Sequence, residues 1–309
     1  MQQQKIKNKF DVNFAHNNLQ AYLKDKKEIV NKFLEKYFKT NFSPQVLHES
    51  MIYSLFADGK RLRPILCLAG YEIGEIDSQN ILPQACAIEL IHTFSLIHDD
   101  LPAIDNDDLR RGKLSNHKKF GDAIAILAGD SLLIEAFEMF LQNNKLIAPQ
   151  VLLEALRELT NAIGTKGLAA GETMDVLCEG KEADEKTLEF IHYHKTAKFI
   201  QASVKIGGIL AGANSKTLKA LESYGKNLGL AFQIIDDILD ITQTTEQLGK
   251  PQGSDVAKKK MTYPALMGLE KSKEKAVAHI KQATTALEFL GKKAFWLNQI
   301  ADYVLTRIN

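Results

Sequence analysis

Two short segments of the chain concentrate carboxylates that could bind divalent cations. Residues 97–112 read IHDDLPAIDNDDLRRG, and residues 232–240 read FQIIDDILD. Most acidic runs are simply solvated turns. Mg²⁺, however, prefers oxygen ligands and typically takes one or two carboxylates together with the phosphates of a substrate. Carboxylates that share a helix face beside apolar residues would therefore indicate a metal site.

The second segment meets this condition. On a helix, Gln233, Asp236 and Asp240 share one face, and the apolar residues between them form another. Like charges one turn apart destabilise a helix, and a divalent cation would relieve that repulsion. A partly buried acidic edge paired with lysines is the alternative interpretation.

The first segment needs a break in its helix to do the same. His92, Ser95 and Asp99 share one face, whereas Asp105 would lie about 120° from Asp99 on a straight helix of ~100° per residue. Pro102 disfavours helix at the residue before it, so the helix should kink or end there. We predict that this break turns Asp105 back towards Asp99.

Three basic sets accompany the acidic segments. Lys60 and Arg63 lie in GKRLRP, Arg110 and Arg111 in LRRG, and Lys250 in LGKPQG. Arginine offers a planar fork to phosphate oxygens, and lysine offers a point charge. Each set alone would indicate a solvated surface, but together with two carboxylate clusters they predict a site for Mg²⁺ and a diphosphate.

The elements that carry these residues are expected to be helices. The apolar periodicity is helical almost throughout, without convincing strand alternation or an Asn-Gly hairpin turn. Glycine and proline are spread between the helical stretches and form no linker. We predict an all-α fold, a single large helical bundle over residues 1–309, in which both acidic segments face a central cavity.

Composition limits the possible functions. The chain has 309 residues, of which 45% are hydrophobic and 25% charged, and its formal net charge is +1. This profile is typical of a soluble globular protein and lacks the basic surplus of a nucleic-acid binder. The apolar stretch 123–141 contains acidic residues, so we expect no membrane span. The N-terminal segment has no signal-peptide core, and the three cysteines form no CxxC pair, which favours a cytoplasmic location.

Six segments, taken in order, resemble those of a known family. They are GKRLRP, ELIHTFSLIHDDLPAIDNDDLRRG, HKTAK, FQIIDDILD, LGKPQGSD and TYPALMG, and they span residues 59–268. The chain is similar to the trans-prenyl diphosphate synthases, above all to the bacterial farnesyl diphosphate synthase (geranyltranstransferase) group. The resemblance implies an isoprenoid-synthase fold, a homodimer, and condensation of isopentenyl diphosphate with dimethylallyl or geranyl diphosphate to farnesyl diphosphate (C15).

The resemblance also implies a role for each site residue. Asp99 and Asp105 match the ligands of two Mg²⁺ ions and Asp236, supported by Asp240, matches the ligand of a third, with Mn²⁺ as a substitute. The isopentenyl diphosphate site is matched by Lys60, Arg63, His92 and Arg111. The allylic diphosphate site is matched by Arg110, Lys195, Thr196, Gln233, Lys250 and Lys260.

Three of these residues, Lys195, Thr196 and Gln233, are expected to take part in the reaction itself. The resemblance implies no side-chain nucleophile: the allylic C–O bond ionises, polar dipoles stabilise the carbocation, and the released diphosphate takes the proton. Plainer interpretations stay open, with Thr196 an ordinary mid-helix threonine and His92 a core histidine.

Phe94 and Ser95 are the expected determinants of product length. Phe94 precedes Asp99 by five residues, which is ~7.5 Å along a helix. In the bacterial farnesyl synthases an aromatic residue here accompanies the two-residue Pro-Ala-type insert, so the resemblance implies a floor that stops the product at C15. Plain core packing of Phe94 is the alternative.

Three other functions remain open. A geranylgeranyl or other short-chain synthase would differ only in the depth of its pocket. A terpene cyclase would lack the second-substrate cations that KRLR and LRRG supply. A non-catalytic synthase subunit would be expected to have degraded aspartate motifs, whereas both are intact in this chain.

Overall fold

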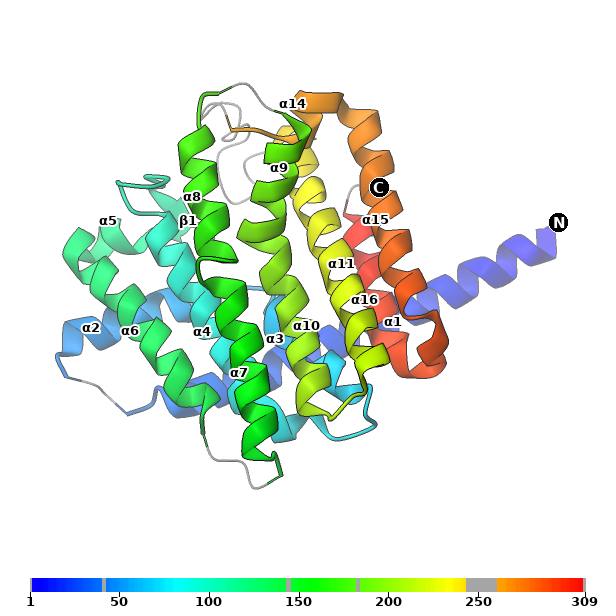
Figure 1. Ribbon diagram of the computed structural model, residues 1–309, viewed down its shortest axis with the longest axis horizontal. Coiled ribbons are helices and arrows are strands. Elements are labelled where there is room, and N and C mark those ends of the chain that lie inside the picture. Colours follow the sequence, from blue (N-terminus) through cyan, green and yellow to red (C-terminus); the bar gives the residue numbers. More distant parts are fainter. Residues whose placement is uncertain (1, 41–42, 143–145, 182–183, 243–259, 308–309) are drawn as a thin grey trace.

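The expected all-α fold is confirmed in the computed structural model, which describes residues 2–40, 43–142, 146–181, 184–242 and 260–307 (Figure 1). Its elements are α1 (Gln2–Tyr37), α2 (Gln45–Leu55), α3 (Leu62–Glu72), η1 (Ser78–Ile81), α4 (Leu82–Asp99), β1 (Leu109–Arg110), β2 (Lys113–Leu114), α5 (Asn116–Phe120), α6 (Asp122–Phe140), α7 (Pro149–Ile163), α8 (Leu168–Cys178), α9 (Glu185–His192), η2 (Tyr193–Ala197), α10 (Lys198–Leu210), α11 (Ser215–Thr242), α14 (Tyr263–Met267), α15 (Leu269–Ala286), η3 (Glu288–Ala294) and α16 (Phe295–Thr306). Within those ranges, the only strands are β1 and β2, a two-residue antiparallel pair.

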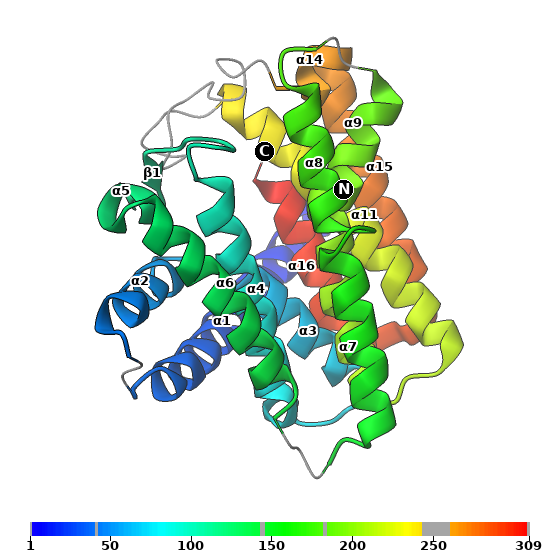
Figure 2. The ribbon, with the colours of Figure 1, turned by 60° about the vertical axis from the view of Figure 1, so that its left-hand side comes forward.

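Two helices form the centre of the bundle because they are apolar nearly all round. Most residues of α4 and of α10 are buried, as expected of helices surrounded by other helices. Helix α4 packs against α6 and α3, while α10 packs against α3, α11 and α7. Figure 2 shows α4 between α6 and α3 from a second side.

The hydrophobic core consists of two clusters. One gathers around α4 and α6 and includes Leu90, Phe140 and Phe199. The other gathers around α11, α15 and α16 and includes Tyr224 and Leu297. The first acidic segment ends a helix of one cluster, and the second lies on a helix of the other.

One segment also has the length and composition of a membrane span. It is Ser78–Asp99, and 67% of its most apolar window is buried inside the fold. This burial is what the core helix of a bundle requires, since its neighbours cover its apolar faces.

Candidate active site

A cavity of about 490 Å³ opens between the two clusters and collects most of the predicted residues. Its wall includes Arg63, His92, Ser95, Asp99, Asp105, Arg110, Arg111, Lys195, Thr196, Gln233, Asp236 and Lys260. These residues come from segments far apart in the sequence, so tertiary packing alone brings them together.

The first acidic segment turns back on itself as expected. Helix α4 ends at Asp99, just before Pro102. The backbone N–H of Asp105 then donates to the carbonyl oxygen of Asp99 at 2.9 Å. This turn returns Asp105 to the helix end, and both side chains line the cavity.

Asp99 is a buried carboxylate whose ionised form is disfavoured. Burial, followed by the negative charges of Glu172 and Asp105, raises its pKa from 3.8 to about 7. Lys195 and Arg110 oppose the shift without cancelling it. An additional cation at this position would favour the ionised form.

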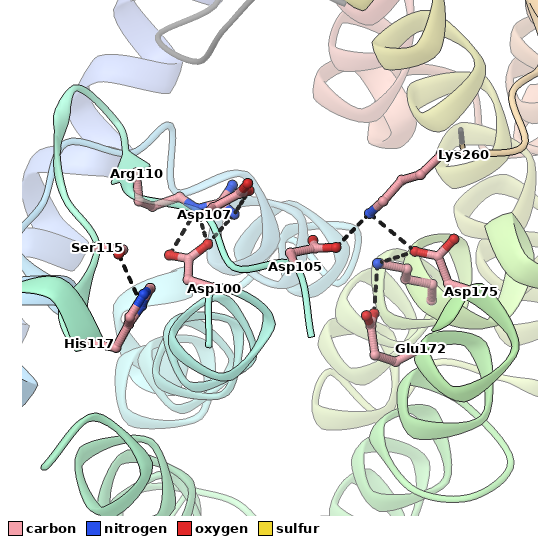
Figure 3. Close-up of polar contacts among 10 residues, drawn as sticks. Asp100, Asp105, Asp107, Arg110, Ser115, His117, Glu172, Asp175 and Lys260 are labelled. Carbon is pink, nitrogen blue, oxygen red and sulfur yellow. Dashed lines mark hydrogen bonds and ion pairs between the residues drawn. The ribbon is translucent and has the colours of Figure 1, made fainter. Parts of the chain in front are cut away.

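Two lysines hold the carboxylates across the cavity (Figure 3). The Nζ of Lys195 lies 2.6 Å from Asp175 and 2.8 Å from Glu172. The Nζ of Lys260 lies 2.8 Å from Asp105 and 3.5 Å from Asp175. Burial acts to lower the pKa of Lys195, but Asp175 and Glu172 raise it above its usual value. Lys195 therefore stays charged.

Glycines on either side of η2 allow this close packing. A Cβ on Gly171 of α8 would lie 2.1 Å from the backbone nitrogen of Lys195, and one on Gly229 of α11 would lie 2.4 Å from the Cα of Ala197. The approach of α11 brings Gln233 within reach of Thr196, whose hydroxyl donates to Gln233 Oε1 at 2.8 Å. The π-helical turn η2 lies between them, and such turns are frequent at functional sites.

Arginines and a histidine cluster on the opposite wall. Arg63 Nη1 lies 3.4 Å from His92 Nε2, and the guanidinium lies 5.3 Å from the centre of the Phe199 ring. Burial lowers the pKa of Arg63 to about 10, which leaves it charged at neutral pH. Burial, together with the charges of Arg63 and Arg111, lowers the pKa of His92 well below its usual value. His92 is therefore a neutral imidazole.

A buried ion pair supports this wall from behind. Arg61 has a left-handed φ of 53° at the start of α3. Its Nη1 lies 2.7 Å from the carboxylate of Glu89, which is 1% exposed, and its Nη2 donates to the carbonyl oxygen of Leu55 at 2.7 Å. Because separating a buried pair leaves an uncompensated charge, the pair fixes the chain between Lys60 and Arg63.

Arg110 is held by the carboxylate that follows the end of α4. Its Nε donates to Asp100 Oδ1 at 2.9 Å, and its Nη2 also contacts Asp100 and Asp107. Asp100 is buried and does not line the cavity. It orients an arginine instead of facing the site.

The second acidic segment differs from the prediction at one position. Asp236 lines the cavity, with its Oδ1 2.8 Å from Arg307 Nη1. Asp240, which we expected beside it, is 1% exposed and does not line the cavity. Four residues advance a helix by one turn and about 40°, and that step takes Asp240 into the packed part of α11. Asp237 lines the cavity in its place.

Two other predicted residues of the described part of the chain, Lys60 and Phe94, are not on the cavity wall. Lys60 is exposed by its accessible surface. Partial burial, followed by the positive charge of Arg307, lowers its pKa, and Asp236 opposes that shift. Phe94 packs edge-on against His98, with 4.8 Å between ring centres, while its neighbour Ser95 lines the cavity. Lys250 lies outside the described residues.

The cavity wall also contains residues that the sequence analysis did not select, among them Glu172, Asp175, His192 and Arg307. The first two had a detectable signal, since two carboxylates three residues apart share a face of a helix. His192 and Arg307 had none, because only tertiary packing brings them here.

Comparison with known proteins identifies the family. Residues 44–294 match the polyprenyl synthetase family. The chain belongs to this family. A chloroplastic geranylgeranyl pyrophosphate synthase of Capsicum annuum is 47% identical over 294 residues, which are 94% of this chain and 79% of that protein. A dimethylallyltranstransferase of Fischerella ambigua is also 47% identical, over 94% of this chain and 84% of its own length.

A solved structure of the same family supports the fold. A geranyltransferase from Legionella pneumophila superposes with a TM-score of 0.82 at 32% identity, covering 94% of this chain and 98% of its own. Membership of the polyprenyl synthetase family makes this chain a prenyltransferase.

Because the pKa of Asp99 is raised, replacing Asp99 with a neutral side chain should stabilise the folded protein at a pH at which Asp99 would be ionised. Its pKa rises on folding, so its contribution to stability is present at low pH and is lost as pH rises through about 7. Asp99→Asn should therefore melt at a higher temperature than wild type at pH 8, but not at pH 4, in metal-free thermal denaturation.

Asp108→Asn is the matched control, because Asp108 is 69% exposed and pairs with Lys118 outside the cavity. It should show no gain at pH 8. Equal melting temperatures of wild type and Asp99→Asn at both pH values would mean that Asp99 is not strained.

Proposed function

We propose that this prenyltransferase condenses isopentenyl diphosphate with dimethylallyl and then geranyl diphosphate in a Mg²⁺-dependent reaction. One observation carries the proposal. Carboxylates of two remote segments, Asp99 and Asp105 on one side and Asp236 on the other, line the same cavity as the arginines and lysines. That arrangement suits two diphosphate groups and the metal ions that neutralise them.

The carboxylates fit Mg²⁺ in number. Among the described residues, no three His, Cys, Asp or Glu side chains stand close enough to hold an ion by themselves. Mg²⁺ does not need such a cage, since it takes one or two carboxylates and completes its shell with water and phosphate. Asp99, Asp105 and Asp236 would hold up to three ions, which when bound would neutralise charge on the departing diphosphate.

The α8 side of the cavity suits the allylic substrate. Lys195 and Lys260 would exchange their carboxylate partners for phosphate oxygens. Arg110, which Asp100 already orients, would approach the same diphosphate from the opposite side of the cavity (Figure 3). The allylic C–O bond would break, with its electron pair leaving on the diphosphate. The oxygen dipoles of Thr196 and Gln233 would then stabilise the carbocation without capturing it.

The α3 side suits isopentenyl diphosphate. Arg63 and Arg111 supply fixed charges, and His92 contributes a neutral imidazole. The double bond of this substrate would attack the carbocation to form the new C–C bond. The proton lost from the adduct would pass to the released diphosphate, as the family resemblance implies, which closes the balance of atoms and charge.

The metal ligands can be tested by removing one carboxylate at a time. Asp99→Ala or Asp236→Ala should lower kcat by about 10²–10³, the usual loss for one transition-state charge stabiliser. Turnover of dimethylallyl and isopentenyl diphosphates would be followed across a Mg²⁺ titration, with Mn²⁺ expected to substitute.

Asp108→Ala is the control for these variants, because it removes an exposed carboxylate of the same segment. It should leave turnover unchanged. Near wild-type kcat in Asp99→Ala at saturating Mg²⁺ would refute the assignment of that ligand.

The assignment of different basic residues to the two diphosphates predicts that single substitutions affect one substrate more than the other. Arg63→Ala should raise the KM for isopentenyl diphosphate, and Arg110→Ala should raise the KM for the allylic diphosphate. Charge-assisted hydrogen bonds contribute about 1.5–3 kcal/mol, which is roughly 10–150-fold. Steady-state kinetics with each substrate varied in turn would measure both values. Similar effects of both variants on both substrates would contradict the separation.

For the product we propose farnesyl diphosphate, C15. The support is the Phe94 ring on α4, directly beside the cavity residue Ser95. Two observations favour C20 as a second candidate. Phe94 itself does not line the cavity, and the Capsicum annuum relative is named a geranylgeranyl pyrophosphate synthase.

Product sizing distinguishes the two candidates. Wild type should yield mainly C15, Phe94→Ala should lengthen the product to C20 or beyond, and Ser95→Phe should shorten it by placing a ring on the cavity wall. Phe289→Ala, which changes an exposed aromatic residue, is the control. Mainly C20 from wild type would favour the second candidate, and an active Phe94→Ala that stops at C15 would remove Phe94 as the determinant.

A further inference from the structure

A chain of hydrogen bonds crosses the cavity wall and ends at Asp237. The hydroxyl of Thr196 donates to Gln233 Oε1 at 2.8 Å. Gln233 Nε2 donates to Asp237 Oδ1 at 3.4 Å, and the backbone N–H of Tyr263 donates to Asp237 Oδ2 at 3.0 Å. The chain therefore links η2, α11 and α14, and its first three side chains all line the cavity.

The donors and acceptors in this chain of hydrogen bonds fix the direction in which each group donates. An ionised carboxylate can only accept hydrogen bonds. The amide of Gln233 must therefore turn its NH₂ towards Asp237 and its oxygen towards Thr196. The hydroxyl proton of Thr196 points to that oxygen, which leaves the hydroxyl lone pairs available to the cavity.

His192 is also close to Asp237 but donates no hydrogen bond to it. His192 Nε2 lies 3.6 Å from Asp237 Oδ2, beyond a hydrogen bond. Burial lowers the pKa of His192 to about 3, so the ring is neutral. Asp237 is 3% exposed, and Tyr263 and Gln233 hold its two oxygens in place.

We infer that Asp237 is a positioning residue that aims the negative end of the Thr196 hydroxyl dipole at the allylic carbocation. This role rests on the proposed function, since it needs positive charge to develop in the cavity. Dipoles fixed before the reaction stabilise such charge without reorganising. Asp237 thus acts through Gln233 and Thr196, although its neighbour Asp236 is a candidate metal ligand.

Asp237→Asn tests the direction of these hydrogen bonds, because the asparagine side chain has almost the same shape as that of aspartate. The amide oxygen of the new side chain can still accept from the Tyr263 N–H, so its NH₂ faces Gln233. Gln233 must then flip and donate to Thr196, whose proton turns into the cavity. We expect kcat to fall by about 10–100-fold, somewhat less than for loss of a direct stabilising group.

Two further measurements distinguish a positioning role of Asp237 from metal binding and from a general loss of active-site structure. The half-saturating Mg²⁺ concentration and the KM for each diphosphate should stay within about threefold of wild type, because no ligand is lost. Asp236→Asn is the matched comparison on the adjacent residue, and it should raise the half-saturating Mg²⁺ concentration. The KM for the allylic diphosphate also reports any displacement of Lys260, which precedes Tyr263.

A double-mutant cycle with Thr196→Val supplies the decisive result. The valine has no hydroxyl dipole to aim, so adding Asp237→Asn to Thr196→Val should lower kcat by less than about threefold. Independent sites would instead multiply their effects.

Each remaining outcome overturns the inference. Multiplicative effects in the cycle would do so, as would near wild-type kcat in Asp237→Asn. A shift in half-saturating Mg²⁺ with kcat restored at saturation would make Asp237 a metal ligand. A wild-type chain without prenyl transfer would overturn the proposed function, whereas an active wild type with any of the former results overturns this role alone.

Discussion

The confinement of several carboxylates around one cavity is the constraint on which the site depends. Burial raises the pKa of Asp99, and the negative charges of Glu172 and Asp105 raise it further. Lys195, which pairs with Asp175, opposes the shift. The helices must therefore position acidic and basic side chains around the same cavity, because a buried charge of either sign is costly without a partner of the other sign.

Close helix packing meets this demand. Gly171 and Gly229 let α8 and α11 approach the two sides of η2, so that Lys195 faces the acids of α8 and Thr196 faces Gln233. A Cβ at either glycine would clash with the backbone of η2 and force it away from the neighbouring helix. The geometry of the polar groups is thus set by backbone contacts behind them.

The sequence predicts the parts of this arrangement that are local. Helical period and a proline break were enough to bring Asp99 and Asp105 to one side, and the all-α class followed from periodicity alone. Asp240 lies off the cavity wall because helical spacing defines a face but not where a cavity ends along it. Arg307 and His192 reach the site only through tertiary packing, for which no local pattern exists.

Two ion pairs on the cavity wall place a basic residue against a carboxylate that we propose as a metal ligand. Lys260 pairs with Asp105, and Arg307 pairs with Asp236. If a divalent cation took each carboxylate and a phosphate took each released base, opposite charges would stay in contact throughout. Each cation would move only from a carboxylate oxygen to a phosphate oxygen, and arginine and lysine bind both. The pairs therefore hold Lys260 and Arg307 as charged groups on the cavity wall, beside the carboxylates that we propose as metal ligands.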